Sequence, residues 1–317
     1  MELKWHLSAQ PHQPVNTVYF GGGTPSVVDP KYLGDLIQVL DKNLGWVGQP
    51  EITIEVNPDD VTDQRIAEWR AIGINRFSMG VQSFDDHVLS WMNRAHGAQQ
   101  ADSAIKRLQD ADLPNITLDI IYGHGMNKLL TWEEDLEKFI AYQTPHLSAY
   151  ALTIEEKTAL SHFTEKQKYA PLDDEEVVNQ FLYLHQRLLE VGMDHYELSN
   201  YAFPGHASQH NSSYWEGIPF WGIGPSAHGY DGEHRRKMNI ANNALYSKSW
   251  VTNNGADAFE WEELTPIQLS NEFWMTGLRT AKGVNLDKWK SKFGLDLPKN
   301  FDDIINKWKS NHCLSIH

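Results

Sequence analysis

Strand-like and helix-like stretches alternate along the first half of the chain, and this alternation restricts the possible folds more than any other feature. Strands separated by helical patterns of about 10–15 residues form parallel sheets, either open and doubly wound or closed toward a barrel. The expected strands are Thr17–Phe20, Glu51–Val56, Asn75–Met79, Ile116–Ile121 and His146–Tyr150. The expected helices are Pro30–Leu44, Thr62–Ile72, Asp85–Trp91, Ala98–Ala111 and Trp132–Tyr142.

Three glycines, Gly21–Gly23, follow the first expected strand, and Thr24 and Pro25 come directly after them. Successive residues without a Cβ atom let a ligand approach the bare backbone closely. A strand, a glycine-rich turn and a following helix form a cradle for carboxylate, amine or phosphate groups. A tight turn without a ligand is the alternative, and we favour the ligand.

Polar residues also lie at or near the carboxyl ends of the later strands. Glu55 with Asn57, Gln82 and Asp119 follow this pattern, and Arg94 comes one helix later. In a barrel these strand ends ring one face, whereas an open sheet concentrates its ligand at a single switch point. The sequence therefore predicts an α/β protein built as a barrel or partial barrel.

Each polar residue has a structural alternative. Glu55 could be an edge charge that faces solvent, Arg94 could end a solvated helix, and Gln82 fits either role. Asp119 is the stronger candidate, because a carboxylate inside an apolar strand is costly to bury unless it binds something. Together the group could hold a zwitterionic ligand, with Arg94 on its carboxylate and the acids on an amine or on ribose hydroxyls.

Charge and cysteine content exclude several classes of protein. The formal net charge of −15 disfavours nucleic-acid and anionic-membrane partners. No apolar run approaches the 18 or so residues of a transmembrane helix, and the first residues do not form a signal peptide. The single cysteine, Cys313, excludes a disulfide framework and any cluster held only by thiolates of this chain. This composition is typical of a cytoplasmic globular protein.

Five motifs, in this order and at these spacings, carry a resemblance to a known family: YFGGGTPS, IEVNP, FSMGVQSF with NRAH, LDIIYG and LSAYALTIE. They resemble the radical S-adenosylmethionine superfamily, most closely the branch of oxygen-independent coproporphyrinogen III oxidase and the heme chaperone HemW. The resemblance covers nearly the whole chain and implies a partial (β/α)6 TIM-like barrel that binds S-adenosylmethionine. It implies that Gly22, Gly23 and Thr24 contact the methionyl portion, and that Glu55, Gln82, Arg94 and Asp119 complete the pocket.

A second-half motif helps to choose within the branch. His210–Trp215 fits HNxxYW, a pattern typical of HemW-like members rather than of the oxidase. On residue chemistry, His210 is a histidine that anchors its loop; the resemblance raises the alternative that His210, Asn211, Tyr214 and Trp215 help to bind heme or orient a partner. No Cys-x-x-Cys-His is present, which excludes conventional c-type heme attachment.

The resemblance implies a heme chaperone that binds S-adenosylmethionine and heme and delivers heme to an acceptor protein. The oxygen-independent oxidase of porphyrin biosynthesis and a cluster-free binding paralogue are the alternatives.

The family pattern breaks first at the front of the chain. Relatives carry a strand and then Cys-x3-Cys-x2-Cys, whose thiolates hold three irons of a [4Fe-4S] cluster while the fourth binds S-adenosylmethionine. This chain lacks those cysteines and the first β/α unit, and the thiolate of Cys313 cannot hold a cubane by itself. We therefore expect a chain truncated at both ends, or a natural cluster-free paralogue, that neither assembles the cluster nor cleaves S-adenosylmethionine. The lost unit would leave Val18–Phe20 as an unpaired apolar edge.

Two further breaks follow. The loop Ile121–Leu130 has Gly123-His124-Gly125 without the proline of its relatives, so a substrate role for this loop is in doubt. Near the end, Asn271–Thr280 opens a small winged-helix-like domain, and the chain stops at Cys313–His317. The expected domains are 1–235, the barrel with its extension, and 236–317, the incomplete helical domain.

Overall fold

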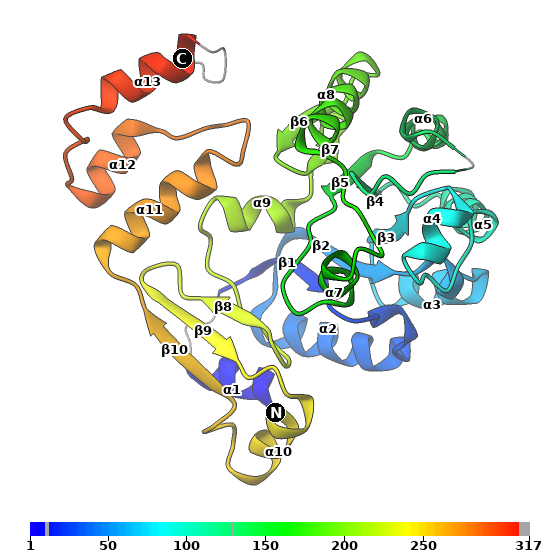
Figure 1. Ribbon diagram of the computed structural model, residues 1–317. Helices are drawn as coiled ribbons and strands as arrows, with labels where there is room; N and C mark the ends of the chain where they lie inside the picture. The colour runs from blue at the N-terminus through cyan, green and yellow to red at the C-terminus, as the bar shows by residue number, and fades with distance from the viewer. Residues whose placement is uncertain (10–12, 129, 311–317) are drawn as a thin grey trace.

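The computed structural model describes residues 1–9, 13–128 and 130–310, and a curled seven-stranded sheet forms its centre (Figure 1). The strand order is β1-β2-β3-β4-β5-β7-β6, with β1 to β5 parallel and β7 antiparallel to both of its neighbours. The strands are β1 (Val15–Phe20), β2 (Trp46–Val56), β3 (Arg76–Gln82), β4 (Ile116–Tyr122), β5 (His146–Ala151), β6 (Asp194–Glu197) and β7 (Asn200–Ala202). The alternation predicted from sequence is confirmed.

Helices cover the outer, convex side of this sheet (Figure 1). They are α2 (Pro30–Leu44), α3 (Asp63–Ala71), α4 (Asp86–Trp91), α5 (Ala98–Asp110), α6 (Trp132–Tyr142) and α8 (Asp174–Glu190), while the short helix α7 (Ala159–Glu165) lies in front of the sheet in this view. Local capping explains where they begin. Thr62 accepts a hydrogen bond from the backbone of Arg65, and Thr131 forms a capping box with Glu134.

The strands have an apolar outer face and a polar inner face. In β3, Phe77, Met79 and Val81 are fully buried in the core between sheet and helices, whereas Ser78 and Gly80 line a cavity on the concave side. Each large apolar side chain buried in this way stabilises the fold by roughly 1.5–3 kcal/mol. The polar inner face leaves a lumen that can be used for binding.

Strand β1 has β2 as its one strand neighbour among the described residues, so the expected sheet edge at Val18–Phe20 is present. No residue of β1 is fully buried. Helix α9 (Gln209–Trp215) packs on this strand, and Figure 1 shows it between the curled sheet and the C-terminal helices.

A second, antiparallel sheet is built from β8 (His228–Tyr230), β9 (Arg235–Asn239) and β10 (Phe259–Glu263), in the order β10-β9-β8. Helix α10 (Asn243–Thr252) and the N-terminal helix α1 (Glu2–Ala9) lie against it (Figure 1). The buried carboxylate of Glu2 holds α1 in place by pairing with Lys237 Nζ at 2.5 Å and by accepting bonds from Asn239 and Tyr246.

The last described elements are α11 (Pro266–Gly277), α12 (Leu286–Phe293) and α13 (Phe301–Ser310). Trp274 joins them, with edge contacts to the rings of Trp289 and Phe301. The expected boundary at 235/236 falls at the start of β9, within the second sheet, and remains a proposal. The segment Cys313–His317 lies outside the described residues. No helix in the described part of the chain is long and apolar enough to cross a membrane.

Candidate functional site

A cavity of about 310 Å³ lies on the concave side of the seven-stranded sheet. This volume is within the range of small-molecule sites, roughly 300–1,000 Å³. The cavity brings together most of the residues singled out from the sequence: Gly23, Thr24, Glu55, Gln82, Arg94, Asp119 and Asn211.

The glycine loop after β1 forms one wall. Gly22 and Gly23 have φ values of 78° and 67°, in the left-handed region that favours glycine. A Cβ atom built on either residue would meet nothing within 4 Å, so both face open space. Gly21 is different, because its added Cβ would lie 2.5 Å from the Tyr19 ring and 2.8 Å from Glu55 Oε1. The loop thus needs one glycine for packing and two for its conformation.

Glu55 ties this loop to the strands. Its carboxylate accepts the Tyr19 hydroxyl at 2.8 Å on one oxygen and the backbone N–H of Gly22 at 2.9 Å on the other. Glu55 therefore lies in the pocket wall and not at a solvent-facing edge.

Asp119 lines the same lumen. The Ser78 hydroxyl lies 3.2 and 3.1 Å from the two carboxylate oxygens. Burial raises the Asp119 pKa to about 7, while hydrogen bonds from Ser148 and Ser78 oppose the rise and the charge of Glu55 adds to it. The carboxyl group can therefore gain or lose a proton near neutral pH.

Arg94 and Gln82 also line the cavity. Arg94 Nη2 donates to Asn57 Oδ1 at 2.9 Å and to the Gly80 carbonyl at 3.2 Å. Gln82 has a φ of 69°, uncommon for a residue with a side chain, at an irregularity in the pairing of β3 with β4. A Cβ on Gly80 would lie 2.9 Å from Gln82 Nε2, so Gly80 leaves room for this amide.

Sequence reasoning missed the polar floor of the cavity. It is lined by inward-facing residues of β2 to β5, namely Thr53, Arg76, Ser78, Thr117, His146 and Ser148. Their signal is a period of two: polar residues occupy alternate positions within otherwise apolar strands. The prediction from sequence rested on the strand ends, and these residues lie earlier in their strands.

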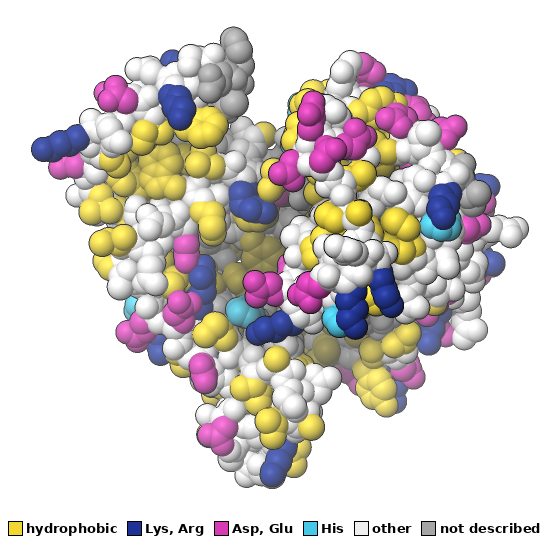
Figure 2. Space-filling view, viewed as in Figure 1, with side chains coloured by type: hydrophobic (Ala, Val, Ile, Leu, Met, Phe, Trp, Pro, Cys, Tyr) yellow, Lys and Arg dark blue, Asp and Glu magenta, His cyan; other side chains and the backbone are white. Residues whose placement is uncertain are grey.

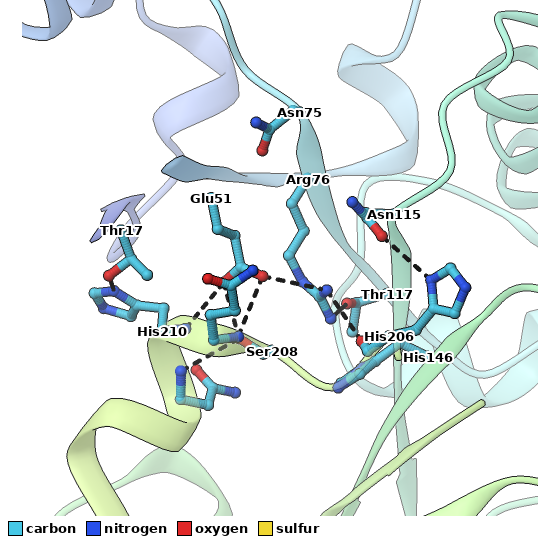
Figure 3. A network of polar contacts seen from close by, with 12 residues as sticks. Thr17, Glu51, Asn75, Arg76, Asn115, Thr117, His146, His206, Ser208 and His210 are labelled. Atoms are coloured by element: carbon cyan, nitrogen blue, oxygen red, sulfur yellow. Dashed lines mark hydrogen bonds and ion pairs between the residues drawn. The ribbon is translucent and has the colours of Figure 1, made fainter. Parts of the chain in front are cut away.

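Arg76 of this floor forms a buried ion pair with Glu51, next to α9 (Figure 3). Arg76 Nη1 lies 3.5 Å from Glu51 Oε2, and Arg76 Nη2 donates to Thr117 Oγ1 at 3.0 Å. Glu51 in turn accepts the backbone N–H groups of Gln209 at 3.2 Å and His210 at 2.9 Å.

Both ring nitrogens of His210 are engaged. Nδ1 bonds Thr17 Oγ1 at 2.8 Å, Nε2 bonds the Tyr214 hydroxyl at 2.9 Å, and the ring stacks on Tyr19. Burial lowers the His210 pKa to about 4, so the imidazole is neutral at pH 7. These contacts support the anchoring role that residue chemistry favoured. His210, Tyr214 and Trp215 do not line the cavity; Trp215 packs under the Arg279 guanidinium at 5.2 Å.

Comparison with known proteins shows the family to which this chain belongs. A model of the Radical SAM superfamily matches residues 4–141. The heme chaperone HemW of Synechocystis is 32% identical over 282 residues, which cover 88% of this chain and 68% of that protein. HemW of Lactococcus lactis is 30% identical over 295 residues, covering 93% and 77%. The chain belongs to the HemW-like branch of the radical SAM superfamily.

A solved structure supports the fold of this HemW-like chain. Coproporphyrinogen III oxidase (HemN) from Escherichia coli, a radical SAM enzyme, matches with a TM-score of 0.73 over 93% of this chain and 69% of that one, at 19% identity. At this identity the likeness concerns the fold, and it confirms the predicted partial TIM-like barrel.

The side chains and backbone of this HemW-like chain suit one of the two family cofactors, S-adenosylmethionine, and not the other, the [4Fe-4S] cluster. Iron–sulfur clusters are held by cysteine thiolates, and the one cysteine, Cys313, lies outside the described residues. Within the described ranges, no group of three or more His, Cys, Asp or Glu side chains could hold a metal ion. The residues therefore do not fit a [4Fe-4S] cluster. An open glycine backbone, a guanidinium and two carboxyl groups do fit S-adenosylmethionine.

The altered loop after β4 does not line the cavity in its described part. Gly123 N–H donates to Gln180 Oε1 at 2.9 Å, and the Asp85 carboxylate accepts the backbone N–H groups of Lys128 and Leu130. These bonds hold the loop against α8 and α4, so they assign it a structural role.

Proposed function

We propose that this chain is a HemW-type heme chaperone that binds S-adenosylmethionine in the half-barrel and heme beside α9, and that delivers heme to an acceptor protein. The proposal rests on two HemW relatives at 30–32% identity. The observation that carries it is the position of the HNxxYW helix, which contributes Asn211 to the cavity and leaves Tyr214 41% exposed.

The S-adenosylmethionine roles follow from the shape of the cavity. Gly22, Gly23 and Thr24 offer an open backbone and a hydroxyl to the methionyl portion. Arg94, which lines the cavity, suits the methionyl carboxylate. Bound S-adenosylmethionine supplies a sulfonium cation, and Asp119 and Glu55 carry the opposite charge in the lumen. Gln82 completes the polar wall.

The heme role is assigned to the outer side of α9. Figure 2 shows a hollow between the barrel side of the molecule and the side formed by the second sheet and the C-terminal helices. Tyr214, Ile218 and Ile223 are exposed close to α9 in the chain, and an apolar macrocycle would cover such side chains. The Arg279 guanidinium beside Trp215 suits a propionate. In this proposal His210 holds the helix.

Hemin titration tests this function. A shifted Soret band with saturable one-to-one binding is expected, followed by transfer to an apo-heme protein on mixing. An unshifted band at micromolar protein and hemin would refute the proposal. Calorimetry with S-adenosylmethionine on the same protein tests the cavity separately.

The presence of a single cysteine favours a second candidate, a cluster-free binding paralogue. Such a protein would bind S-adenosylmethionine without heme, so the same two titrations distinguish the candidates. For either one we propose a cytoplasmic location, from the charge and cysteine content. The oxidase reaction is not proposed for this chain, because its own residues cannot hold the cluster that the family uses.

A further inference from the structure

The ion pair Glu51–Arg76 is nearly inaccessible to solvent, with 6% and 3% of the two residues exposed. Removing two charges from water is costly, and an apolar pair of similar volume often stabilises a fold as well or better. Stability is therefore a weak explanation for charges at this position. The partners of Glu51 suggest another one.

Glu51 reaches across from β2 to the first turn of α9 (Figure 3). Its two oxygens accept the hydroxyl of Ser208 at 3.4 Å and the backbone N–H groups of Gln209 and His210. Backbone N–H groups in the first turn of a helix have no partner within that helix, and a carboxylate is a strong acceptor for them. Glu51 therefore completes the start of α9 from a different element.

Apolar burial contributes little to the position of α9, although the helix contacts β1. None of its seven residues is fully buried, so α9 lacks the apolar face that normally orients a surface helix. Arg76 fixes the other side of Glu51, since its guanidinium also donates to Thr117 and to the carbonyl of His206, just before the helix.

We propose that Glu51 is a positioning residue for the HNxxYW helix, and that Arg76 holds the Glu51 carboxylate in the orientation that reaches this helix. This inference rests on the proposed heme function of α9 and extends it to a residue paired with Arg76 of the cavity floor. Glu51 sets where the helix begins. His210 then reaches Thr17 and Tyr19, and Tyr214, which is bonded to His210, keeps part of its ring exposed.

A matched pair of double variants tests the role, because a single change at Glu51 would leave Arg76 buried without a countercharge. E51Q/R76Q removes both charges and keeps an oxygen acceptor for α9. E51M/R76Q has nearly the same volume and lacks the acceptor. E137A, which breaks the half-exposed pair of Glu137 with Arg187 between α6 and α8, is the control.

Three measurements are made on the full chain: hemin affinity from the Soret band, hydrogen exchange of the peptide 208–216, and the urea midpoint. We expect E51M/R76Q to bind hemin at least tenfold more weakly than wild type and to exchange at least tenfold faster in 208–216. E51Q/R76Q should bind at least fivefold more tightly than E51M/R76Q at a similar urea midpoint. E137A should match wild type in affinity and in exchange.

Equal hemin affinity in the two double variants would overturn the inference while leaving the heme function intact. If wild type does not shift the Soret band, the proposed function fails. The inference is then decided by exchange in 208–216, where equal rates in the two double variants would refute it and faster exchange in E51M/R76Q would support it.

Discussion

The imidazole of His210 stacks on the ring of Tyr19, with centroids 4.9 Å apart and planes inclined by 21°. The Tyr19 hydroxyl donates to Glu55, and Glu55 accepts the N–H of Gly22. The HNxxYW helix and the glycine loop thus share one set of contacts around a single tyrosine. A change at that tyrosine should affect both sides.

The first prediction concerns Tyr19→Phe, which keeps the stacked ring and removes the bond to Glu55. Loss of one such bond should destabilise the fold by about 1–2 kcal/mol and loosen the glycine loop. We expect S-adenosylmethionine affinity, measured by calorimetry, to fall at least fivefold. Tyr32→Phe, at a tyrosine that is 63% exposed, serves as the control. Wild-type affinity in Tyr19→Phe would show that Glu55 does not need this bond.

The second prediction concerns the pH dependence of S-adenosylmethionine binding. Because burial raises the Asp119 pKa to about 7, this group is mostly neutral at pH 6 and ionised at pH 8. A cationic ligand prefers the ionised form, so affinity should rise by up to about tenfold per pH unit below pH 7 and level off above it. Calorimetry in buffers of different ionisation enthalpy should detect proton release near pH 7. Asp119→Asn should abolish both effects, and an unchanged profile in that variant would exclude Asp119.

The third prediction uses a pair of glycines with similar backbones. Gly23→Ala should cost about 1–2 kcal/mol, because its φ of 67° is unfavourable for a side chain. Gly192→Ala, with a φ of 88° and open space around its Cβ, should cost about the same. Only Gly23→Ala should weaken S-adenosylmethionine binding, by tenfold or more. Urea unfolding and calorimetry are measured on both variants. Equal S-adenosylmethionine affinities would contradict the proposed role of Gly23 in binding the ligand.

The fourth prediction concerns the buried pair of Glu2 and Lys237. Burial opposes ionisation of Glu2, but hydrogen bonds from His6, Lys237, Tyr246 and Gly224 outweigh it and lower its pKa from 4.5 to about 2. A carboxyl with a lowered folded pKa stabilises the fold above its unfolded pKa, and this stability is lost as pH falls from about 4.5 toward 2.

Lys237→Met should therefore unfold at a higher pH in acid titrations followed by circular dichroism, and should cost about 3–5 kcal/mol at pH 7. The double variant Glu2→Gln/Lys237→Met should recover part of that loss. If Lys237→Met and wild type unfold together, the pair has no role in holding α1.

Local patterns were sufficient to predict the barrel. Thr62 and Thr131 cap two of the predicted helices, and the five parallel strands lie within a few residues of their expected places. The carboxyl ends of parallel strands meet at one edge, so the sequence also predicted that Thr24, Glu55 and Asp119 would lie together. Their role in binding S-adenosylmethionine stays a prediction.

Contacts between distant segments could not be predicted in this way. In the sequence, Glu51 and Arg76 are ordinary charged residues at the starts of two expected strands. Their role depends on contact with α9, which lies about 160 residues after Glu51 in the chain. The left-handed backbone of Gln82 depends on how β3 pairs with β4, which no local pattern of that segment shows. Tertiary pairing decides both features.

The contact of α1 with the second sheet has a consequence for how the chain matures. Glu2 leaves the ribosome long before Lys237, its partner 235 positions later. Until then Glu2 lacks Lys237 as its countercharge, and a contact of such high sequence separation forms late. The contact of α1 with the second sheet should therefore form only after Lys237 leaves the ribosomal tunnel, and nascent chains that stop before Lys237 should remain sensitive to proteases within Glu2–Ala9.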